Sequence, residues 1–283
     1  MSELTVRAPA KLNLTLEVLG KRPDGFHEIR SVFQAVNLCD ELRFRQSGEL
    51  VIKSVTPGWD AEKSLVARAV SLLQESAGGS YGVEIEVVKN IPLVSGLGGD
   101  SSDAAAVLRG LNELWELKLP NNELLELAAR LGSDVPFFLS GGTALAEGRG
   151  EKLTPFPSLP PMWAVLVKPD TTQIEGKTGR LYAALREEHY TDGRITQRLV
   201  TTLRAGGEIT DDLLFNTFEN VAYGVFGGLD VYKEHLLKLG APHVRLAGSG
   251  PALFTLLQDK ATAEDIYTRC KDQGMKVFLA GVV

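Results

Sequence analysis

The stretch from Ile91 to Leu111, IPLVSGLGGDSSDAAAVLRGL, decides how the rest of this chain is interpreted. A helix is predicted to open in it at Ser102 or Asp103. Four small residues come just before that start: Gly96, Gly98, Gly99 and Ser101. Glycine lets the backbone approach a ligand closely, and a helix start offers unpaired N–H donors and a partial positive charge. The stretch therefore predicts a phosphate-binding site, to which the two serines can add hydroxyl donors or metal ligands.

The stretch differs from the two best-known phosphate loops. No Gly-Lys-Ser/Thr follows, which excludes a Walker A loop, and the third glycine of the dinucleotide fingerprint is missing. The structural alternative is a Gly-rich turn that caps a core helix, since Ala105, Leu108 and Leu111 recur at helical spacing. Burial of that helix face is compatible with phosphate binding at its start, so both interpretations stay open from the loop alone.

Composition narrows the class of protein. The chain has 283 residues, 44% of them hydrophobic, a formal net charge of −6 and two cysteines. One large or two modest domains are expected. Without a basic tract, a long apolar run, a signal-peptide pattern or a metal-ligand cysteine spacing, we expect a cytoplasmic protein that binds neither nucleic acid nor membrane. An anionic ligand must then be held by local donors.

The N-terminal segment reads as a strand over residues 4–20, with apolar residues at alternate positions. Because Pro9 interrupts the run, a bend or bulge is expected near residues 8–11. The polar alternates Lys11, Asn13 and Thr15 form either a solvated strand face or a functional row. A turn follows at Arg22-Pro-Asp-Gly25. Phe26 and His27 come next, as ordinary surface residues or as a stacking site for a planar ligand.

The middle of the chain alternates strands and helices. A hairpin is predicted over 41–55 around Ser47-Gly48, and a strand over 83–90 feeds the glycine-rich stretch. Helices are expected at 60–77, 103–117 and 122–131. Asp134 lies in a short turn behind the last of them. Pro136 favours an extended residue 135, and residues 137–148 read as strand, glycine turn and strand.

The Pro-rich run 153–161 is the best candidate for a crossing between domains. Beyond it, strands are predicted at 162–169, in 243–257 around a glycine turn, and at the end of the chain, where the last strand either pairs with another chain or caps a sheet edge. Helical patterns cover 178–188, 194–204, 213–223, 229–240 and 261–274. This second half therefore reads as an α+β layer.

Four blocks in this order resemble the GHMP kinase superfamily: residues 9–34 (PAKLNLTLEVLGKRPDGFHEIRSVFQ), 96–112 (GLGGDSSDAAAVLRGLN), 131–151 (with LGSDVPFF and GGTALAEGRGE) and 246–254 (LAGSGPALF). The resemblance implies an α+β, two-domain GHMP kinase fold. A ribosomal-protein-S5-like α/β domain would span residues 1–158 and a ferredoxin-like α+β domain residues 159–283, with the active site in the cleft between them. ATP with Mg²⁺ would be the donor, and the protein would be a monomer or a weak homodimer.

The blocks PAKLNL and RPDGFHEI narrow the resemblance to a branch that serves non-mevalonate isoprenoid synthesis and phosphorylates a cytidine-diphosphate-linked methylerythritol. Two departures from its pattern stand out. Asp100 replaces a usual third glycine. Because a carboxylate repels phosphates, Asp100 either turns outward or holds Mg²⁺ directly or through water, and the outward orientation is favoured. Ser64 replaces an asparagine near the adenine, which bears on the purine contacts.

The resemblance also assigns site residues. Lys11 and Asp134 would form the catalytic pair, and no residue is predicted as a metal ligand. The ATP site would comprise Ser64, Pro92, Gly96, Leu97, Gly98, Gly99, Ser101 and Ser102, with the turn Ala247–Gly250 closing the phosphate region. The substrate site would comprise Asn13, Phe26, His27, Ile29, Phe33, Gly132, Ser133, Thr178 and Tyr182.

These residue types suit phosphoryl transfer, which needs positioning and charge stabilisation. An aspartate can accept the proton of the attacking hydroxyl, and a lysine beside it keeps the aspartate ionised and neutralises the moving phosphoryl group. Two other functions are weighed against this one: a GHMP kinase for homoserine or a mevalonate-type acid, and a non-catalytic nucleotide sensor. Phe26 and His27 argue against the first, and the presence of Lys11 and Asp134 argues against the second.

Overall fold

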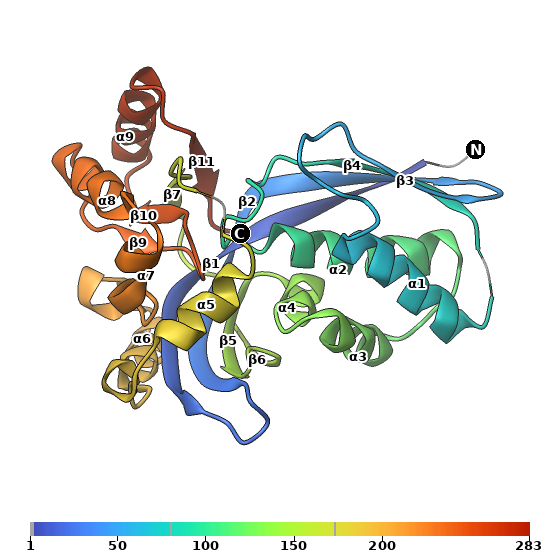
Figure 1. Cartoon of the computed structure of the whole chain (residues 1–283), viewed down its shortest axis with the longest axis horizontal. Helices are drawn as coiled ribbons and strands as arrows, with labels where there is room; N and C mark the ends of the chain where they lie inside the picture. The colour runs from blue at the N-terminus through green and yellow to red at the C-terminus, as the bar shows by residue number, and fades with distance from the viewer. Residues whose placement is uncertain (1–2, 80, 173) are drawn as a thin grey trace. The chain divides into compact units, whose positions relative to one another are not determined.

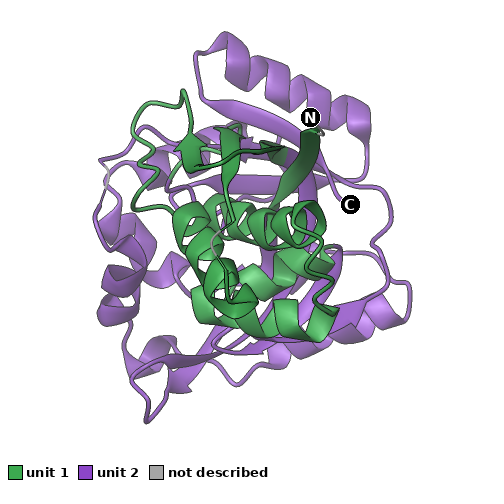
Figure 2. Cartoon of the chain, turned by 90° about the vertical axis from the view of Figure 1, so that its right-hand side faces the viewer, with its two compact units in different colours: residues 1–10, 39–93, 98–141 green, residues 11–38, 94–97, 142–283 purple. Residues whose placement is uncertain are grey.

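The computed structural model describes residues 3–79, 81–172 and 174–283. The chain falls into two compact units, drawn in green and purple in Figure 2. Unit 1 comprises residues 1–10, 39–93 and 98–141, and unit 2 comprises residues 11–38, 94–97 and 142–283. Each unit is made of several separate segments of the chain, whereas the predicted domains are two continuous ranges, 1–158 and 159–283. The two divisions are therefore not comparable, and the predicted boundary at 158/159 stays a prediction.

Unit 1 contains a three-stranded arrangement with β4 (Val83–Val88) at its centre. The second half of β2 (His27–Gln46) pairs antiparallel with β4, from Glu41 opposite Val88 to Gln46 opposite Val83. On the other edge β3 (Leu50–Lys53) pairs parallel with β4. The predicted hairpin over residues 41–55 is therefore wrong. β4 lies between the two strands, and its alternate residues Val83, Ile85 and Val87 are fully buried.

Four helices of unit 1 pack together beside these strands (Figure 1). They are α1 (Leu65–Ala77), α2 (Gly99–Leu114), α3 (Asn121–Leu131) and α4 (Val135–Ser140). α2 begins at Gly99, earlier than the predicted Ser102 or Asp103. The N–H of Ser102 already donates to the carbonyl of Gly98 at 2.9 Å. Gly98 takes a φ of 76°, which suits glycine. The serines of the loop therefore lie inside the first turn of the helix.

Helix α4 corrects the prediction of a strand over the first half of 137–148 and of an extended residue 135. Pro136 stands in the first turn of α4, where a proline loses no hydrogen bond and its fixed φ suits a helix. Phe137 and Phe138 are buried from this turn. Burial of both aromatic rings thus outweighs the tendency of a residue before proline to be extended.

Unit 2 contains the larger part of β1 (Glu3–Lys21), a strand that continues through Pro9. β8 (Phe215–Asn216) pairs parallel with β1 at Thr15. β5 (Thr143–Gly148) pairs antiparallel with the first half of β2 and with β6 (Lys152–Phe156). Lys11, Asn13 and Thr15, for which a solvated face was one of two alternatives, are all buried, so they form an inward polar row.

A second sheet of unit 2 has the order β11-β7-β10-β9, all antiparallel. Its strands are β7 (Trp163–Val167), β9 (Arg245–Leu246), β10 (Leu253–Leu257) and β11 (Val277–Gly281). The final strand β11 therefore lies at a sheet edge, one of the two expected places. Helix α9 (Lys260–Asp272) packs on β7, β10 and β11 (Figure 1).

The other helices of unit 2 are α5 (Lys177–Ala184), α6 (Arg194–Arg204), α7 (Glu219–Val225) and α8 (Leu229–Lys238), with short 3₁₀ turns at Glu187–His189 and Asp211–Leu213. The predicted helix 213–223 begins late, because Phe215 and Asn216 pair with β1 before α7 opens. Among the described residues, every helix is too short or too polar to cross a bilayer.

Candidate active site

The centre of the glycine-rich stretch, Gly96, is held between segments of unit 2. Its φ is 90°, and a Cβ built there would lie 2.1 Å from the carbonyl oxygen of Ala247 and 2.7 Å from the nitrogen of Gly250. Leu97 accepts a 2.9 Å hydrogen bond from the N–H of Lys11, and Ser95 accepts one of 3.1 Å from Ala252. Only glycine fits this close contact. The loop is thereby joined both to β1 and to the turn 247–250.

Lys11 lies in the polar row of β1. Its Nζ donates to Oδ1 of Asn13 at 2.7 Å, and Asn13 in turn donates to Oγ of Ser31 at 2.9 Å. The ammonium also lies 4.3 Å from the ring centroid of Phe33, within cation–π range. The structure thus brings together three predicted site residues, Lys11, Asn13 and Phe33. Each is buried, so the ammonium is fixed by protein contacts.

The helix start belongs to unit 1. In its first turn the side-chain hydroxyl of Ser102 is buried and has no hydrogen-bond partner among the described residues. The first N–H groups of α2 are the orphan donors of a helix N-terminus. Asp100 in the same turn exposes 59% of its side chain, which agrees with the expected outward orientation. Backbone donors and the unused hydroxyl therefore suit phosphate oxygens, so these residues fit a nucleotide phosphate.

A buried ion cluster at the base of this helix escaped the sequence analysis. Nζ of Lys89 lies 2.5 Å from Oδ2 of Asp40 and 2.6 Å from Oδ2 of Asp103, and 3.6 Å from Asp100. Oδ1 of Asp40 accepts hydrogen bonds from the N–H groups of Asn90 and Ile91, at 2.6 and 2.7 Å. Burial, together with the nearby Asp40 carboxylate, raises the pKa of Asp103. The cluster joins the second half of β2, the segment after β4 and the first turns of α2.

Two of the aromatic residues predicted for substrate binding, His27 and Tyr182, meet in unit 2. The ring of His27 stacks on that of Tyr182, with centroids 4.5 Å apart and an angle of 16° between the planes. Phe26 is half exposed, and the guanidinium of Arg149 lies 4.6 Å from its ring centroid. Burial, and then the charge of Lys21, lower the pKa of His27. The imidazole is therefore neutral at pH 7, with one donor and one acceptor nitrogen.

Comparison with known proteins decides the family. The model "GHMP kinases N terminal domain" matches residues 64–142, and "GHMP kinases C terminal" matches residues 199–275. A 4-diphosphocytidyl-2-C-methyl-D-erythritol kinase of Dehalococcoides mccartyi is 49% identical over 99% of this chain and 98% of its own length. The chain belongs to the 4-diphosphocytidyl-2-C-methyl-D-erythritol kinase family of GHMP kinases. It is accordingly an ATP-dependent small-molecule kinase.

Other relatives support the same family and fold. A protein of the same name from a Geobacillus species is 37% identical over 99% of this chain and 97% of its own. A crystal structure of 4-(cytidine 5'-diphospho)-2C-methyl-D-erythritol kinase has a TM-score of 0.84 at 33% identity, covering 99% of both chains. Homoserine kinase from Cytophaga hutchinsonii, at 23% identity and a TM-score of 0.72, shares the fold. The expected two-domain α+β GHMP kinase fold is confirmed.

The remaining predicted site residues of this kinase occupy varied environments. Ser64 caps α1, accepting from the N–H of Ala67 at 3.2 Å and donating to Ala61 at 2.6 Å, so its hydroxyl serves the helix. Ile29 packs in the hydrophobic core of unit 2. Oγ1 of Thr178 donates to Oγ of Ser249 at 2.9 Å, which ties α5 to the turn 247–250.

The last predicted residues lie in unit 1. Gly132 ends α3, and Ser133 and Asp134 form the turn before α4. Pro92 is buried after β4. Within the described ranges, no group of three histidine, cysteine or acidic side chains has the arrangement of a metal site.

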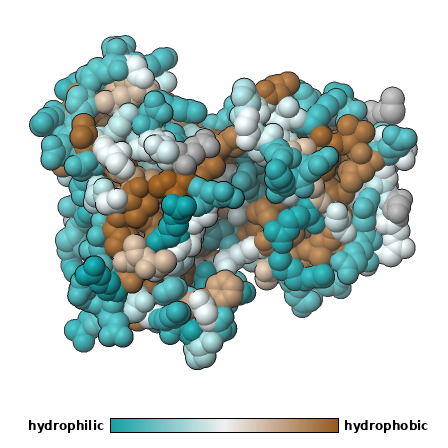
Figure 3. Space-filling view, in the orientation of Figure 1, coloured by the Kyte–Doolittle hydropathy of each residue, from teal (hydrophilic) through white to brown (hydrophobic). Residues whose placement is uncertain are grey.

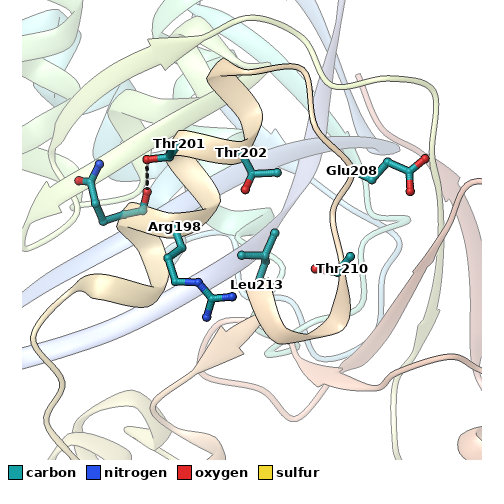
Figure 4. Close-up of a pocket in the computed structure, with 7 residues that line it drawn as sticks. Arg198, Thr201, Thr202, Glu208, Thr210 and Leu213 are labelled. Atoms are coloured by element: carbon teal, nitrogen blue, oxygen red, sulfur yellow. Dashed lines mark hydrogen bonds between the residues drawn. The ribbon is translucent and has the colours of Figure 1, made fainter.

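A cavity of about 450 Å³ lies between α6 and the segment that follows it (Figure 4). Arg198, Thr201, Glu208 and Leu213 are among its lining residues, and Thr201 donates to the backbone carbonyl of Gln197 inside α6 at 2.9 Å. None of the predicted site residues lines it. We therefore assign it no part in the kinase reaction.

Proposed function

We propose that the protein transfers the γ-phosphoryl group of ATP to the 2-hydroxyl of 4-diphosphocytidyl-2-C-methyl-D-erythritol in the non-mevalonate route to isoprenoid precursors. The observation that carries the proposal is the aromatic site at His27. A neutral imidazole stacked on Tyr182, with Phe26 close by in the sequence, offers π-faces and a donor–acceptor pair to a planar heterocycle. The relatives that share this chain's full length carry the name of that activity.

In the proposed reaction Asp134 is the general base and Lys11 the charge stabiliser. A tertiary alcohol is a weak nucleophile, so a carboxylate that accepts its proton as transfer proceeds contributes roughly 10²–10⁴ in rate. The ammonium of Lys11, held by Asn13 at 2.7 Å, supplies fixed positive charge for the transferring group. Its protein contacts are in place before substrate arrives, so little reorganisation is needed.

We further propose that the nucleotide phosphates bind at Gly96–Ser102. The unused hydroxyl of Ser102 and the first N–H groups of α2 support this assignment. Mg²⁺ bound to ATP would neutralise charge on the β- and γ-phosphates. Asn13, Phe33 and Thr178 are proposed substrate contacts, whereas Ser64 and Ile29 are already engaged in a helix cap and in the core.

The test is a coupled ADP-release assay with Mg-ATP. It compares the cytidylated substrate with unmodified methylerythritol, homoserine and mevalonate. We expect turnover with the cytidylated compound alone. Turnover of homoserine or mevalonate instead would overturn the substrate assignment, and nucleotide binding without turnover of any compound would indicate a sensor.

The catalytic assignment has its own test. Asp134→Asn is expected to remove turnover while nucleotide binding, followed by calorimetry, stays within a few-fold of wild type. Glu126→Gln, an exposed carboxylate of the same unit, is the matched control and is expected to keep full activity. A fully active Asp134→Asn enzyme would sink the general-base role.

A further inference from the structure

A cavity of about 560 Å³ opens in unit 2 at the start of α5. It is lined by Val94, Ile174, Glu175, Gly176, Lys177, Thr178 and Gly179. Figure 3 colours one face of the molecule by hydropathy and shows hydrophobic side chains in brown between hydrophilic ones in teal. The proposed function uses Thr178 from this set, but it gives Lys177 no role.

Lys177 is held against the phosphate region. Its Nζ donates to the carbonyl of Gly250. The same carbonyl oxygen would lie 3.1 Å from a Cβ built on Gly96, so the ammonium and the glycine loop meet at one peptide group. Thr178 adds a second link to the turn through its bond to Ser249. A phosphate held at Gly96 therefore comes within reach of the Lys177 side chain.

The electrostatic surroundings of Lys177 are unusual for a lysine in an acidic protein. Among the described residues, no carboxylate lies within ion-pair distance of its ammonium, although Glu175 lines the same cavity. Burial, and then the charges of Lys168 and Lys11, lower the pKa of Lys177 to about 7. Lys168 faces Lys276 and Asp170, and its own pKa is lowered by burial. A partly buried ammonium with cationic neighbours is stabilised when an anion joins it.

We propose that Lys177 is a phosphate-binding residue of this kinase, whose ammonium turns from the Gly250 carbonyl to form an ion pair with a ligand phosphate. The inference rests on the proposed function and adds a residue to that site. Two ligands share the required chemistry, the triphosphate of ATP and the diphosphate of the cytidylated acceptor. The experiment separates them.

Ion pairing of this kind couples binding to protonation. In the free protein at pH 8 most Lys177 side chains are neutral, because their pKa is about 7. A bound phosphate favours the ammonium, so binding takes up a proton, and affinity falls as pH rises from 7 to 9. At pH 6 the lysine is already charged, and the uptake by this group disappears.

Isothermal titration calorimetry in buffers of different ionisation enthalpy measures that proton uptake directly. Mg-ATP and the cytidylated acceptor are titrated separately at pH 6 and pH 8 into wild type, Lys177→Met and Lys177→Arg. For one of the ligands we expect wild type to take up a substantial fraction of a proton at pH 8. Lys177→Met is expected to lose that uptake together with about 10–100-fold in affinity, as for a lost charged hydrogen bond. Lys177→Arg is expected to keep affinity without proton uptake, because an arginine stays charged.

Lys271→Met removes one exposed positive charge from α9 and serves as the control for net charge. Unchanged affinity of Lys177→Met for both ligands, or an equal loss in Lys271→Met, would overturn the proposal. If Lys177→Met does not fold, the comparison of wild type with Lys177→Arg tests the proposal. Proton uptake is then expected in the wild type and not in Lys177→Arg, and equal uptake in both would overturn the proposal. A Lys177-dependent uptake with ATP in a protein that fails to phosphorylate the cytidylated compound would reject the proposed function alone.

Discussion

Removal of the ammonium from the buried cluster should destabilise unit 1 strongly. In Lys89→Met, the carboxylates of Asp40 and Asp103 lose the group that lies 2.5 and 2.6 Å away. Lys89 exposes 2% of its side chain and both aspartates 0%. Solvent therefore cannot replace the lost charge. Breaking such a buried pair from one side costs about 3–5 kcal/mol of the free energy of unfolding.

The assay is urea and thermal unfolding followed by circular dichroism. A loss of that size corresponds to a fall in Tm of about 6–20 °C, taking about 2–4 °C per kcal/mol for a chain of 150–250 residues as the nearest guide. Lys53→Met is the matched control in the same unit. Its ammonium lies 2.7 Å from Glu84 on an exposed surface, where an ion pair contributes about 0–1 kcal/mol.

The pH dependence gives the reasoning a second check. Burial already raises the pKa of Asp103, and loss of the Lys89 charge, which opposes that rise, raises it further above the value in the unfolded chain, so the folded state of the variant binds more protons than the unfolded state. The deficit of Lys89→Met against wild type should thus be largest at pH 8 and shrink as pH falls toward about 4. A deficit below about 1 kcal/mol, or one that grows on acidification, would refute the account of the cluster.

Two further substitutions probe the loop and the early helix. Gly96→Ala should lose nucleotide affinity and stability together, because its Cβ would meet the Ala247 carbonyl at 2.1 Å. Gly224→Ala is the control, since nothing lies within 4 Å of a Cβ built there. Equal effects of the two substitutions in calorimetry and unfolding would contradict the steric argument. Ser64→Ala should cost about 0.5–2 kcal/mol through the lost helix cap, measured by urea unfolding against Ser71→Ala. If Ser64→Ala lowers ATP affinity more than Ser71→Ala does, Ser64 contacts the adenine as well as capping the helix.

Local sequence pattern was sufficient where an element's own residues determine its form. α6 spans Arg194–Arg204, as predicted from its spacing, and α3 differs by one residue at its start. The sequence pattern was insufficient where residues far away in the chain determine which strands pair. Nothing in residues 41–55 indicates that β4 would pair with both neighbouring strands. The burial of Lys11, Asn13 and Thr15 likewise depends on what packs over β1, which alternation cannot show.

Some residues of the candidate site could likewise be identified from the sequence, and others could not. The resemblance identified Lys11, Asn13 and Phe33, and the structure brings them together, while their roles stay proposals. It also singled out His27 and Tyr182, whose rings stack. The Lys89 cluster was missed because its members come from positions 40, 89 and 103, far apart in the chain. Lys177 was missed because its surroundings are made by the turn 247–250 and by neighbouring lysines.

The interleaving of the two units has a consequence for synthesis on the ribosome. All segments of unit 1 have been made once residue 141 has emerged. The part of β1 in unit 2 must wait much longer, because Thr15 pairs with Phe215, and the N–H of Val18 donates to Oγ1 of Thr217. The nascent chain thus carries a strand with alternating apolar residues, without these partners, while some 200 further residues are translated. Chaperone binding during elongation is expected to concentrate on this strand, and a stop codon placed after residue 158 should yield an aggregating fragment in place of a free-standing domain.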